Sequence, residues 1–377
     1  MSNLHILHCH STFSLGGKEA RAVRLMNAFG DAARHTVISA IPDALGARDA
    51  IAPGVIVDFP THAPSLEGKP ALSRYRKLAG YMQRFDLILT YNWGSMDAVM
   101  TRRMFPNDLP PLVHHEDGFN ADESQTLKTK RNLFRRLGLP AAHALVVPSQ
   151  RLEKIAFDIW KQPKARVHLI PNGIDVKAYR SKPTVSIPGL RKKPGEVVIG
   201  TLAGLRAVKN LPRLVRAAAA VPNSRLVIVG EGPEREAILA EAVRIGYADR
   251  LIMPGFMAGP HRYIGVFDIF ALSSDSEQFP ISLVEAMAAG LPCVSTDVGD
   301  VAQIVSKENR RFVVASNDEA GLRNALLALA ADANLRAAVG VTNQARARAN
   351  FGETTMISAY KALYENAVGW RGAFGES

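Results

Sequence analysis

Cysteine is scarce in this chain of 377 residues: only Cys9 and Cys293 occur, far apart and each inside an apolar run. A disulfide framework is therefore not indicated, and a reducing compartment is the default. The first residues lack the charged start and long apolar core of a signal peptide. No run of about 18 uninterrupted apolar residues is present that would span a membrane. These absences predict a cytoplasmic protein with no transmembrane segment.

Acidic residues are also in deficit, with 35 Asp and Glu against 46 Lys and Arg, which gives a formal charge of +11. A basic balance indicates an anionic partner but does not identify it, so nucleic acid, an anionic membrane face and phosphorylated small molecules stay open. The sequence contains no Asp-x-Asp pair. This absence disfavours metal-dependent chemistry on a diphosphate, so we expect neither a metal nor another cofactor.

Short apolar runs alternate with helical patterns along the chain, which is typical of an open parallel sheet with helices on both faces. The pattern restarts after the Pro- and Lys-rich segment 179–195, which has the composition of a linker. We therefore predict an α/β protein with two Rossmann-like, doubly wound domains, 1–180 and 181–355, facing a central cleft. Residues 356–377 are expected to form a helix that packs back on the first domain.

The stretch Asp275–Thr296, DSEQFPISLVEAMAAGLPCVST, combines two acidic side chains with the start of a predicted helix. Glu277 lies in the loop before that helix, and Glu285 lies in its first turns. Unpaired backbone N–H groups at a helix start bind phosphate together with the helix dipole. Here these groups belong to Ile281, Ser282 and Leu283. The stretch is interpreted as an anion site between two carboxylates, which suits a sugar nucleotide. The alternative is an ordinary strand–loop–helix unit with solvated glutamates.

The loop 204–210, GLRAVKN, places two cations three residues apart after a predicted strand. Arg206 can grip phosphate oxygens with two N–H groups, and Lys209 adds a point charge. Glu231 and Phe256 lie in loops at neighbouring strand ends and are expected to frame a nucleotide base. A leaving diphosphate needs its charge neutralised as it departs. Two cations and a helix start supply this without a metal.

Two features of the first half follow predicted strands, at the sheet edge where ligands bind in such folds. Gly16 and Gly17 precede a helix and allow close approach of a ligand to the backbone; the alternative is a tight turn. The second feature is a polar cluster after the strand that begins at Leu112. Its members are His114, His115, Glu116 and Asp117. The alternative for either histidine is a packed, hydrogen-bonded imidazole.

The segment 128–136 is strongly basic and carries no acid, with an apolar strip between its cations. Its basic residues are Lys128, Lys130, Arg131, Arg135 and Arg136. One interpretation is an amphipathic helix on an anionic membrane surface, and the other is a solvated helix face. No nucleic-acid recognition motif, zinc-binding spacing or aromatic ladder accompanies it, so a nucleic-acid partner is not predicted.

The motifs PSQRL, IPNGID, GLRAVKN, VGEGPE, PGF and the two glutamates with EAMAAG occur in this order. In this combination, roughly residues 4 to 365 resemble the family 4 retaining glycosyltransferases of the GT-B fold. The resemblance implies a nucleotide-sugar donor held mainly by the second domain and an acceptor held by the first. It also implies transfer with retention at the anomeric carbon.

The resemblance further implies roles for the donor residues. Arg206 and Lys209 match the pair that binds the diphosphate. Glu277 matches the glutamate that faces the donor sugar, and Glu285 matches the one that binds the ribose. The family usually continues its first glutamate with Gly-Phe-Gly, whereas this chain has Gln278, Phe279 and Pro280. Phe279 is kept in the expected donor loop, but the loss of both glycines restricts that loop and removes one N–H at Pro280.

In the first domain, Gly16 and Gly17 match the family's glycine loop near the phosphates. His114 matches the histidine near the reacting centre, and His115 is its rival because neighbouring strand residues point to opposite faces. Glu116 and Asp117 fall in the acceptor region.

The sequence thus predicts a retaining, metal-independent glycosyltransferase that moves a sugar from a UDP-linked donor to a cell-surface polysaccharide or glycolipid precursor. We expect the basic segment 128–136 to contact a lipid-linked acceptor at the inner membrane face. Two alternatives stay open: a GT-B enzyme that acts on nucleotide sugars without an acceptor, as an epimerase does, and a basic binding protein without turnover.

Overall fold

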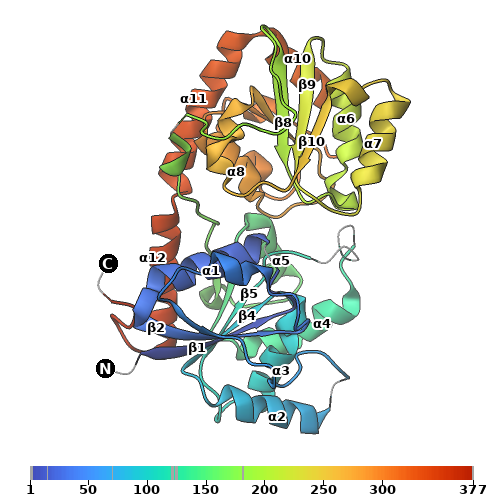
Figure 1. The fold of residues 1–377 in the computed structure, drawn as a ribbon. Helices are drawn as coiled ribbons and strands as arrows, with labels where there is room; N and C mark the ends of the chain where they lie inside the picture. Colours follow the sequence, from blue (N-terminus) through green and yellow to red (C-terminus); the bar gives the residue numbers. More distant parts are fainter. Residues whose placement is uncertain are drawn as a thin grey trace. The chain divides into compact units, whose positions relative to one another are not determined.

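The computed structural model describes residues 3–14, 16–69, 71–119, 123, 126–180 and 182–375 (Figure 1). It divides into two compact units. Unit 1 comprises Met1–Asn172 with Thr355–Ser377, and unit 2 comprises Gly173–Thr354. The chain leaves unit 1 before the Pro- and Lys-rich segment 179–195, so that this segment lies in unit 2. It returns to unit 1 for its last helix.

Unit 1, in the part of the chain described, is built on a seven-stranded sheet with the order β3-β2-β1-β4-β5-β6-β7, and its strand pairs are parallel. The strands are β1 (Leu4–His10), β2 (Ala33–Ser39), β3 (Ile56–Asp58), β4 (Leu87–Tyr91), β5 (Leu112–His115), β6 (Ala144–Val147) and β7 (Val167–Leu169). From β1 the strands β2 and β3 are added on one side of the sheet, and from β4 the strands β5, β6 and β7 are added on the other. The carboxyl ends of β1 and β4 therefore flank the switch point where ligands bind in open α/β sheets.

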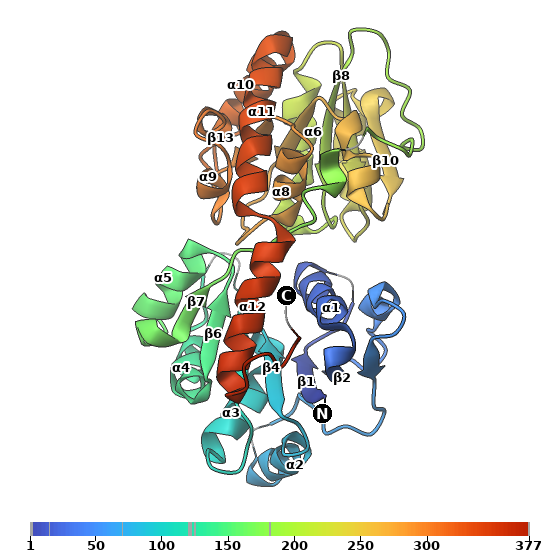
Figure 2. The same cartoon turned by 90° about the vertical axis from the view of Figure 1, so that its left-hand side faces the viewer.

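Helices cover both faces of this sheet because successive strand residues alternate between the two faces. They are α1 (Gly17–Phe29), α2 (Leu72–Met82), α3 (Met96–Met104), α4 (Thr129–Gly138), α5 (Gln150–Asp158) and α12 (Glu353–Val368). On one face Ile6, Leu89 and Val113 pack with α1 and α12, and Figure 2 shows α12 crossing the sheet of unit 1 beside α1. On the other face Leu7 and Ile88 pack with α2, α3 and α5.

Unit 2 has, within the described residues, a six-stranded parallel sheet with the order β10-β9-β8-β11-β12-β13. The strands are β8 (Val197–Leu202), β9 (Ser224–Val229), β10 (Leu251–Gly255), β11 (Ile269–Leu272), β12 (Cys293–Thr296) and β13 (Val313–Val314). Its switch point lies between β8 and β11. The loops that follow these two strands are 203–210 and 273–280, which are the two loops that the sequence connects with phosphate and sugar binding.

The helices of unit 2 are α6 (Leu211–Ala219), α7 (Arg235–Arg244), α8 (Ile281–Ala288), α9 (Val301–Ile304), α10 (Glu319–Ala331) and α11 (Ala333–Asn350). One core joins α8 and α9 to Val198 and Phe270 of the sheet. The other joins α6, α7 and α10 to Ile199 and Ile228. The predicted architecture of two doubly wound, parallel α/β sheets is confirmed.

Both cysteines are free and buried, Cys9 in β1 and Cys293 in β12. No single helix in the described ranges is long and apolar enough to cross a membrane. The pair α10 and α11 reaches the required length and composition only when joined across a bend of 106°. Several side chains of α10, such as Leu322 and Leu326, are buried in the core of unit 2.

Candidate functional site

The loops after β8 and β11 are bonded to each other at the switch point of unit 2. The short helix η8 (Ala207–Lys209) turns the first loop, and Asn210 ends it in the left-handed conformation with φ 44°. The Asp275 N–H donates to the Val208 carbonyl at 2.8 Å, and the Ser273 hydroxyl donates to the Lys209 carbonyl at 3.0 Å. These bonds hold the two loops in a fixed mutual position.

Lys209 and Glu277 form an ion pair across these loops. The Lys209 Nζ donates to Glu277 Oε1 at 2.5 Å, and the Ser274 hydroxyl donates to the same oxygen at 2.7 Å. Both side chains are mostly covered, with 15% and 11% of their surface exposed. The sequence did not predict this pairing, because the two residues lie 68 positions apart. The pair places one cation and one carboxylate at a single point of the sheet edge.

Arg206 differs from Lys209 because its side chain is exposed. In the ranges that the structure describes, no carboxylate forms an ion pair with it. Gly204 lies beside it, and a Cβ at that position would approach Arg206 Nε to 3.7 Å. An exposed guanidinium next to a switch point is available to a phosphate from solvent.

Helix α8 starts at the same edge, after Pro280 as its N-cap residue. The N–H groups of Ile281 and Ser282 find no acceptor among the described residues. The third group differs from the expectation: the Leu283 N–H donates to the Pro280 carbonyl at 3.1 Å. It is paired because the first turn tightens, so two N–H groups and not three are open to an anion.

The loop that carries Gln278 and Phe279 is backed by the turn after β12. Gly299 has φ +58°, and a Cβ there would lie 2.6 and 2.5 Å from the carbonyl oxygens of Glu277 and Gln278. The Asp300 N–H donates to the Gln278 carbonyl at 3.1 Å. Sequence reasoning missed this support, although a glycine after a predicted strand was a visible signal.

The side chains of the same loop face inward. Gln278 is buried with 8% exposure, and its Oε1 is buried without a hydrogen-bond partner. The Phe279 ring packs edge-on against Phe351, with ring centroids 5.6 Å apart. Gln278 and Pro280, which stand where the family usually has glycines, are both buried in unit 2.

Glu285 accepts a hydrogen bond from the Tyr179 hydroxyl at 2.9 Å. Burial, and after it the charge of Glu285, raises the pKa of the neighbouring Tyr263. Tyr179 comes from the Pro- and Lys-rich segment that the sequence presented as a linker. Its bond to Glu285 shows that this segment is part of the site's surroundings.

The loops with Glu231 and Phe256 lie at the next strand ends. Gly230 and Gly232 have φ of +143° and +153°, and Cβ atoms there would lie 1.9 Å from the Ala203 carbonyl oxygen and 2.5 Å from that of Leu205. Only glycines allow this approach of the two loops. The Phe256 N–H donates to Glu231 Oε1 at 3.5 Å, and the Phe256 ring is 60% exposed. An exposed ring at a strand end offers a face on which a base can stack.

In unit 1, Gly16 is the N-cap residue of α1. A Cβ at Gly16 would lie 2.8 Å from Glu19 Oε2, so the carboxylate of Glu19 lies against the glycine loop that includes Gly17. Glu19 is buried and paired with Lys18. Burial raises the pKa of Glu19, and Lys18 opposes that shift. The structure thus places an acidic side chain where the sequence suggested a phosphate.

His114 and His115 are both buried, on opposite faces of β5. His114 Nδ1 lies 2.8 Å from the Thr90 hydroxyl, and its Nε2 lies 3.6 Å from Glu116 Oε2. His115 Nε2 lies 2.8 Å from the Tyr364 hydroxyl of α12, and its Nδ1 lies 3.1 Å from the Thr90 carbonyl oxygen. Burial, and after it Arg21, lowers the pKa of His115. Each imidazole has packing partners inside unit 1, and the assignment of His114 to the reacting centre stays a prediction.

Glu116 and Asp117 each pair with an arginine distant in sequence. Glu116 accepts from the buried Arg135 at 2.8 Å. Burial alone would raise the pKa of Glu116, but Arg135 and His114 hold it below its usual value. Asp117 receives two N–H bonds from the buried Arg21, one of them at 2.8 Å. Both carboxylates of the predicted acceptor region therefore serve internal ion pairs.

The basic helix α4 presents two different faces. Arg135 is fully buried, and its guanidinium lies 5.2, 5.5 and 5.1 Å from the ring centroids of Trp93, Phe119 and Trp160. Its inclusion in a membrane-contacting set was wrong, because the aromatic rings and Glu116 keep it inside unit 1. Lys128, Lys130 and Arg136 are exposed, as are Leu133 and Leu137 at 56% and 50%. Arg131 is half-buried and bonds Glu123 at 2.7 Å.

A cavity of about 450 Å³ lies between α4 and the end of β4. The Trp93 and Phe134 rings line it, 5.6 Å apart and nearly perpendicular. Two cations, Lys130 and Arg131, and two carboxylates, Glu67 and Asp97, also line its wall. This is a concave site beside the end of β4, at the switch point of unit 1, and it combines aromatic rings with charged groups that could orient a small molecule.

No cluster of three or more His, Cys, Asp or Glu side chains in the described ranges has the arrangement of a metal site.

Comparison with protein families connects both halves to one kind of enzyme. A model described as "Glycosyl transferases group 1" matches residues 185–346, and one described as "Glycosyltransferase Family 4" matches residues 15–178. Together they cover the donor loops of unit 2 and most of unit 1.

Curated relatives point the same way. D-inositol 3-phosphate glycosyltransferase from Corynebacterium jeikeium is 30% identical over 315 residues, which is 74% of this chain and 72% of the relative. N-acetyl-alpha-D-glucosaminyl L-malate synthase from Bacillus anthracis is 24% identical over 244 residues, 63% of either chain. The lipopolysaccharide core biosynthesis glycosyltransferase LpsD of Rhizobium meliloti is 26% identical over 192 residues, 51% of this chain and 56% of its own. The last two alignments thus span less than two thirds of the relatives' lengths.

Among solved structures, HepE from Anabaena in complex with UDP-glucose superposes with a TM-score of 0.78 at 20% identity. The match covers 97% of this chain and 100% of the other. At this identity the likeness supports the fold alone.

Proposed function

Since the chain belongs to the glycosyl transferases group 1 family and has the GT-B fold, we propose that it transfers a sugar from a UDP-linked donor with retention at the anomeric carbon. The acceptor we propose is a lipid-linked precursor of a cell-surface polysaccharide or glycolipid, met at the inner face of the membrane. The observation that supports the donor half best is the convergence of Arg206, the Lys209–Glu277 pair and the start of α8 at one switch point.

The donor's diphosphate is proposed to bind Arg206 together with the N–H groups of Ile281 and Ser282. Arg206 is exposed and unpaired among the described residues, so it loses no ion pair when the diphosphate arrives. Donors aimed at charge that develops in the transition state contribute most to such a step. Lys209 adds a second cation close by, already positioned by Glu277.

Glu277 and Glu285 are proposed to orient the donor's hydroxyl groups. A carboxylate accepts hydrogen bonds from vicinal sugar hydroxyls, and Ser274 and Lys209 fix the orientation of Glu277. Glu285 keeps a partner in Tyr179 and is assigned to the ribose. The exposed Phe256 ring is assigned to the uracil face.

In the proposed step the bond between the anomeric carbon and the diphosphate oxygen breaks. The acceptor hydroxyl then forms its bond on the same face of the sugar. The proton of that hydroxyl passes to the departing phosphate oxygen. The negative charge left on the diphosphate is met by Arg206, Lys209 and the α8 start, and for this reason we propose that the reaction does not depend on a metal ion.

For the acceptor we propose the cavity lined by Trp93 and Phe134. Aromatic rings offer apolar surface to the C–H face of a sugar, and Lys130 is placed to contact a phosphate of the lipid carrier. The exposed Leu133 and Leu137 on the outer side of α4, beside Arg136, suit insertion at a membrane surface. The same short helix would then bind both the membrane and the acceptor's head group.

The experiment that tests the donor half is a thermal-shift screen of UDP, GDP and ADP sugars on the full chain. Ligands that bind the native state raise the melting temperature by mass action. We expect a UDP sugar to raise it in wild type and not in Arg206→Ala. A rise that persists in Arg206→Ala would contradict the assignment of the diphosphate site.

The reaction class is tested by proton NMR of the stabilising donor with and without membrane extract as a source of acceptor. Retention predicts that an α-linked donor gives an α-linked product. Conversion of the donor to an epimer in the absence of acceptor would favour the epimerase alternative instead. His114→Asn tests the remaining role: loss of kcat with an unchanged free energy of unfolding would place it at the reacting centre, whereas a fall in stability alone would make it a core residue.

A further inference from the structure

A second cavity in unit 1, of about 620 Å³, lies away from the carboxyl ends of the strands. It is formed where β5 and β6 begin, since Leu112 and Ala142 to His143 line its floor. The donor loops, the glycine loop and the Trp93 cavity all follow the opposite, carboxyl ends of strands. The proposed function assigns nothing to this second cavity.

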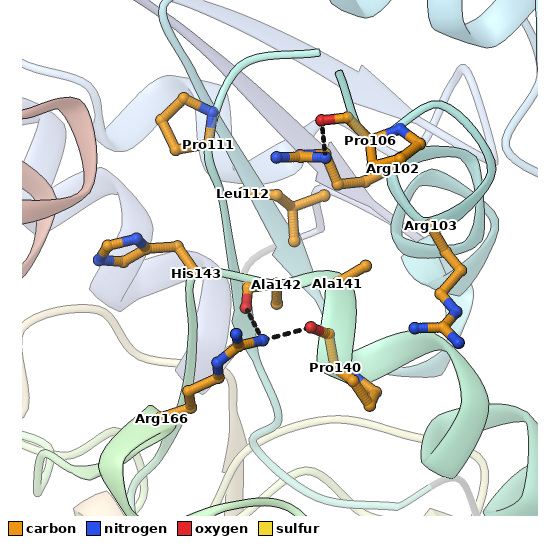
Figure 3. A pocket seen from close by; sticks show the side chains of 10 residues that line it. All are labelled: Arg102, Arg103, Pro106, Pro111, Leu112, Pro140, Ala141, Ala142, His143 and Arg166. Atoms are coloured by element: carbon orange, nitrogen blue, oxygen red, sulfur yellow. Dashed lines mark hydrogen bonds between the residues drawn. The ribbon is translucent and has the colours of Figure 1, made fainter. Parts of the chain in front are cut away.

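The charged side chains of this cavity have one sign. Its lining includes Arg102, Arg103, His143 and Arg166 but no aspartate or glutamate (Figure 3). Figure 3 shows the arginines on different sides of the cavity, Arg102 and Arg103 on α3 and Arg166 on the segment before β7. None of these cations forms an ion pair with a carboxylate in the part of the chain described.

Two of the guanidinium groups are held in place by backbone carbonyls. Arg102 donates to the Pro106 carbonyl at 2.6 Å and to the Pro110 carbonyl at 3.2 Å. Arg166 donates through one nitrogen to the Pro140 and Ala142 carbonyls. These contacts fix the two groups and leave N–H donors of Arg166 unused. Three prolines, Pro106, Pro111 and Pro140, also line the cavity, and the fixed φ of each restricts the backbone of its wall.

Arg103 makes no contact of this kind and is exposed, so its five N–H donors face solvent. His143 lies on the opposite wall and bonds Asn366 Oδ1 at 2.9 Å through Nε2. Burial without a nearby carboxylate also lowers the pKa of Arg102. Three arginines around one cavity, two of them fixed and none compensated by a carboxylate in its lining, suit a group with several anionic oxygens, since guanidinium forks match phosphate geometry.

We propose that this cavity is a phosphate-binding site, separate from the donor site, for a phosphomonoester or diphosphate group. The chemistry fits two sources: the head group of an anionic lipid, and a free phosphorylated metabolite. The cavity wall formed by Pro140 and Ala141 directly follows the C-terminal end of α4, whose outer residues Leu133 and Leu137 are exposed. A head group bound here would lie beside the helix that we assign to the membrane surface.

The test measures pyrophosphate binding by calorimetry on the full chain in an Arg206→Ala/Lys209→Ala background, so that the donor loops do not contribute. The cavity variant adds Arg103→Gln and Arg166→Gln, because glutamine keeps a donor for the Pro140 carbonyl. The matched control adds Arg76→Gln and Lys77→Gln, two exposed cations of α2 in the same unit. We expect the cavity variant to bind pyrophosphate about tenfold more weakly and the control to bind as the background does. Equal binding in all three proteins would overturn the proposal.

Arg103→Gln alone serves if the cavity variant fails to fold, because this side chain forms no bond with the described residues of unit 1. It should weaken binding by itself, and unchanged binding would again count against the site. Co-sedimentation with phosphatidylcholine vesicles, with and without phosphatidic acid, distinguishes the two sources. A parallel loss of phosphatidic-acid-dependent sedimentation in the cavity variant identifies a lipid head group. Unchanged sedimentation together with weaker pyrophosphate binding identifies a soluble ligand. Neither result depends on glycosyl transfer, so the site can stand or fail independently of the proposed function.

Discussion

At the strand ends of unit 2, Arg206 and two backbone N–H groups have no partner among the described residues, whereas the two carboxylates that follow β5 in unit 1 pair with buried arginines. In unit 2, Arg206 is exposed and the α8 start leaves two N–H groups open. In unit 1, Glu116 binds Arg135 and Asp117 binds Arg21, with both arginines buried. The sequence shows a polar motif in both places.

This difference shows that a polar cluster after a strand offers groups to a ligand only where the neighbouring elements leave some of those groups unpaired. In unit 2 the unpaired groups are Arg206 and the backbone N–H groups at the start of α8, and we propose that they bind the donor. In unit 1 the cluster fixes the loop around Asp117, and the ligand contact that we propose lies at the cavity lined by Trp93. The following predictions test that contrast.

The largest expected effect is on the acid stability of unit 1. His8, His10, His35 and His115 are buried there, and burial lowers the pKa of each, that of His35 to about 4. The unfolded chain takes up these protons near pH 6.5. The stabilisation by the neutral imidazoles is therefore complete above about pH 6.5 and is lost as the pH falls toward 4. The expected slope is about 1.4 kcal/mol per pH unit for each histidine.

Tryptophan fluorescence during urea unfolding isolates this effect, because Trp93, Trp160 and Trp370 all belong to unit 1. Unit 2 contains one histidine, the exposed His261. His35→Asn should flatten the pH dependence, while His62→Asn, at an exposed position of unit 1, should leave it unchanged. A fluorescence transition that is equally stable at pH 7 and pH 5 would contradict the prediction.

The next effect concerns the Arg135 pair. Arg135→Ala leaves Glu116 buried without its cation, and such a loss costs about 3–5 kcal/mol of unfolding free energy. Arg136→Ala, the adjacent exposed residue of α4, should change it by less than about 0.5 kcal/mol. The measurement is again urea unfolding followed by tryptophan fluorescence. Equal free energies of unfolding for the two variants would contradict a stabilising role of the buried Arg135–Glu116 pair.

In unit 2 an arginine-to-alanine substitution should lower catalytic activity without changing the free energy of unfolding. Arg206→Ala is expected to lower kcat/KM about 100-fold, because we propose that this group stabilises the leaving diphosphate. Its free energy of unfolding should stay close to wild type, since the side chain is exposed and unpaired among the described residues. UDP release is the assay, and Arg348→Ala, an exposed arginine of α11, is the control. An equal loss in both variants would argue for a general charge effect.

The smallest effect is expected from Gly299→Ala. The added Cβ would press on the Glu277 and Gln278 carbonyls and shift the donor loop, for an expected loss of about tenfold in kcat/KM. Gly246→Ala has the same strain at φ +69° but meets nothing within 4 Å, so it should keep its activity. If both variants lose activity alike, backbone strain and not the donor loop is responsible.

Much of the fold was predictable because it depends on local pattern. Alternating apolar strands and helices specified two parallel α/β sheets, and the loops after β8 and β11 were located through short contiguous motifs. The turn at Gly299 could also have been predicted, since a glycine after a strand is a local signal. The pairing of the Leu283 N–H could not be predicted, because no sequence pattern indicates that one helix turn tightens.

The sequence by itself determined the two sheets and the position of Arg206, Glu277 and the α8 start, because their arrangement follows from strand order and from backbone at strand ends. Only the tertiary structure decided which charged groups remain available. Arg21 lies 96 residues from Asp117, and Arg135 lies 19 residues from Glu116. A charge is buried or exposed according to what packs around it, and the cost of desolvation then forces a buried charge to find a partner. No local pattern distinguishes a carboxylate that binds substrate from one that neutralises an arginine.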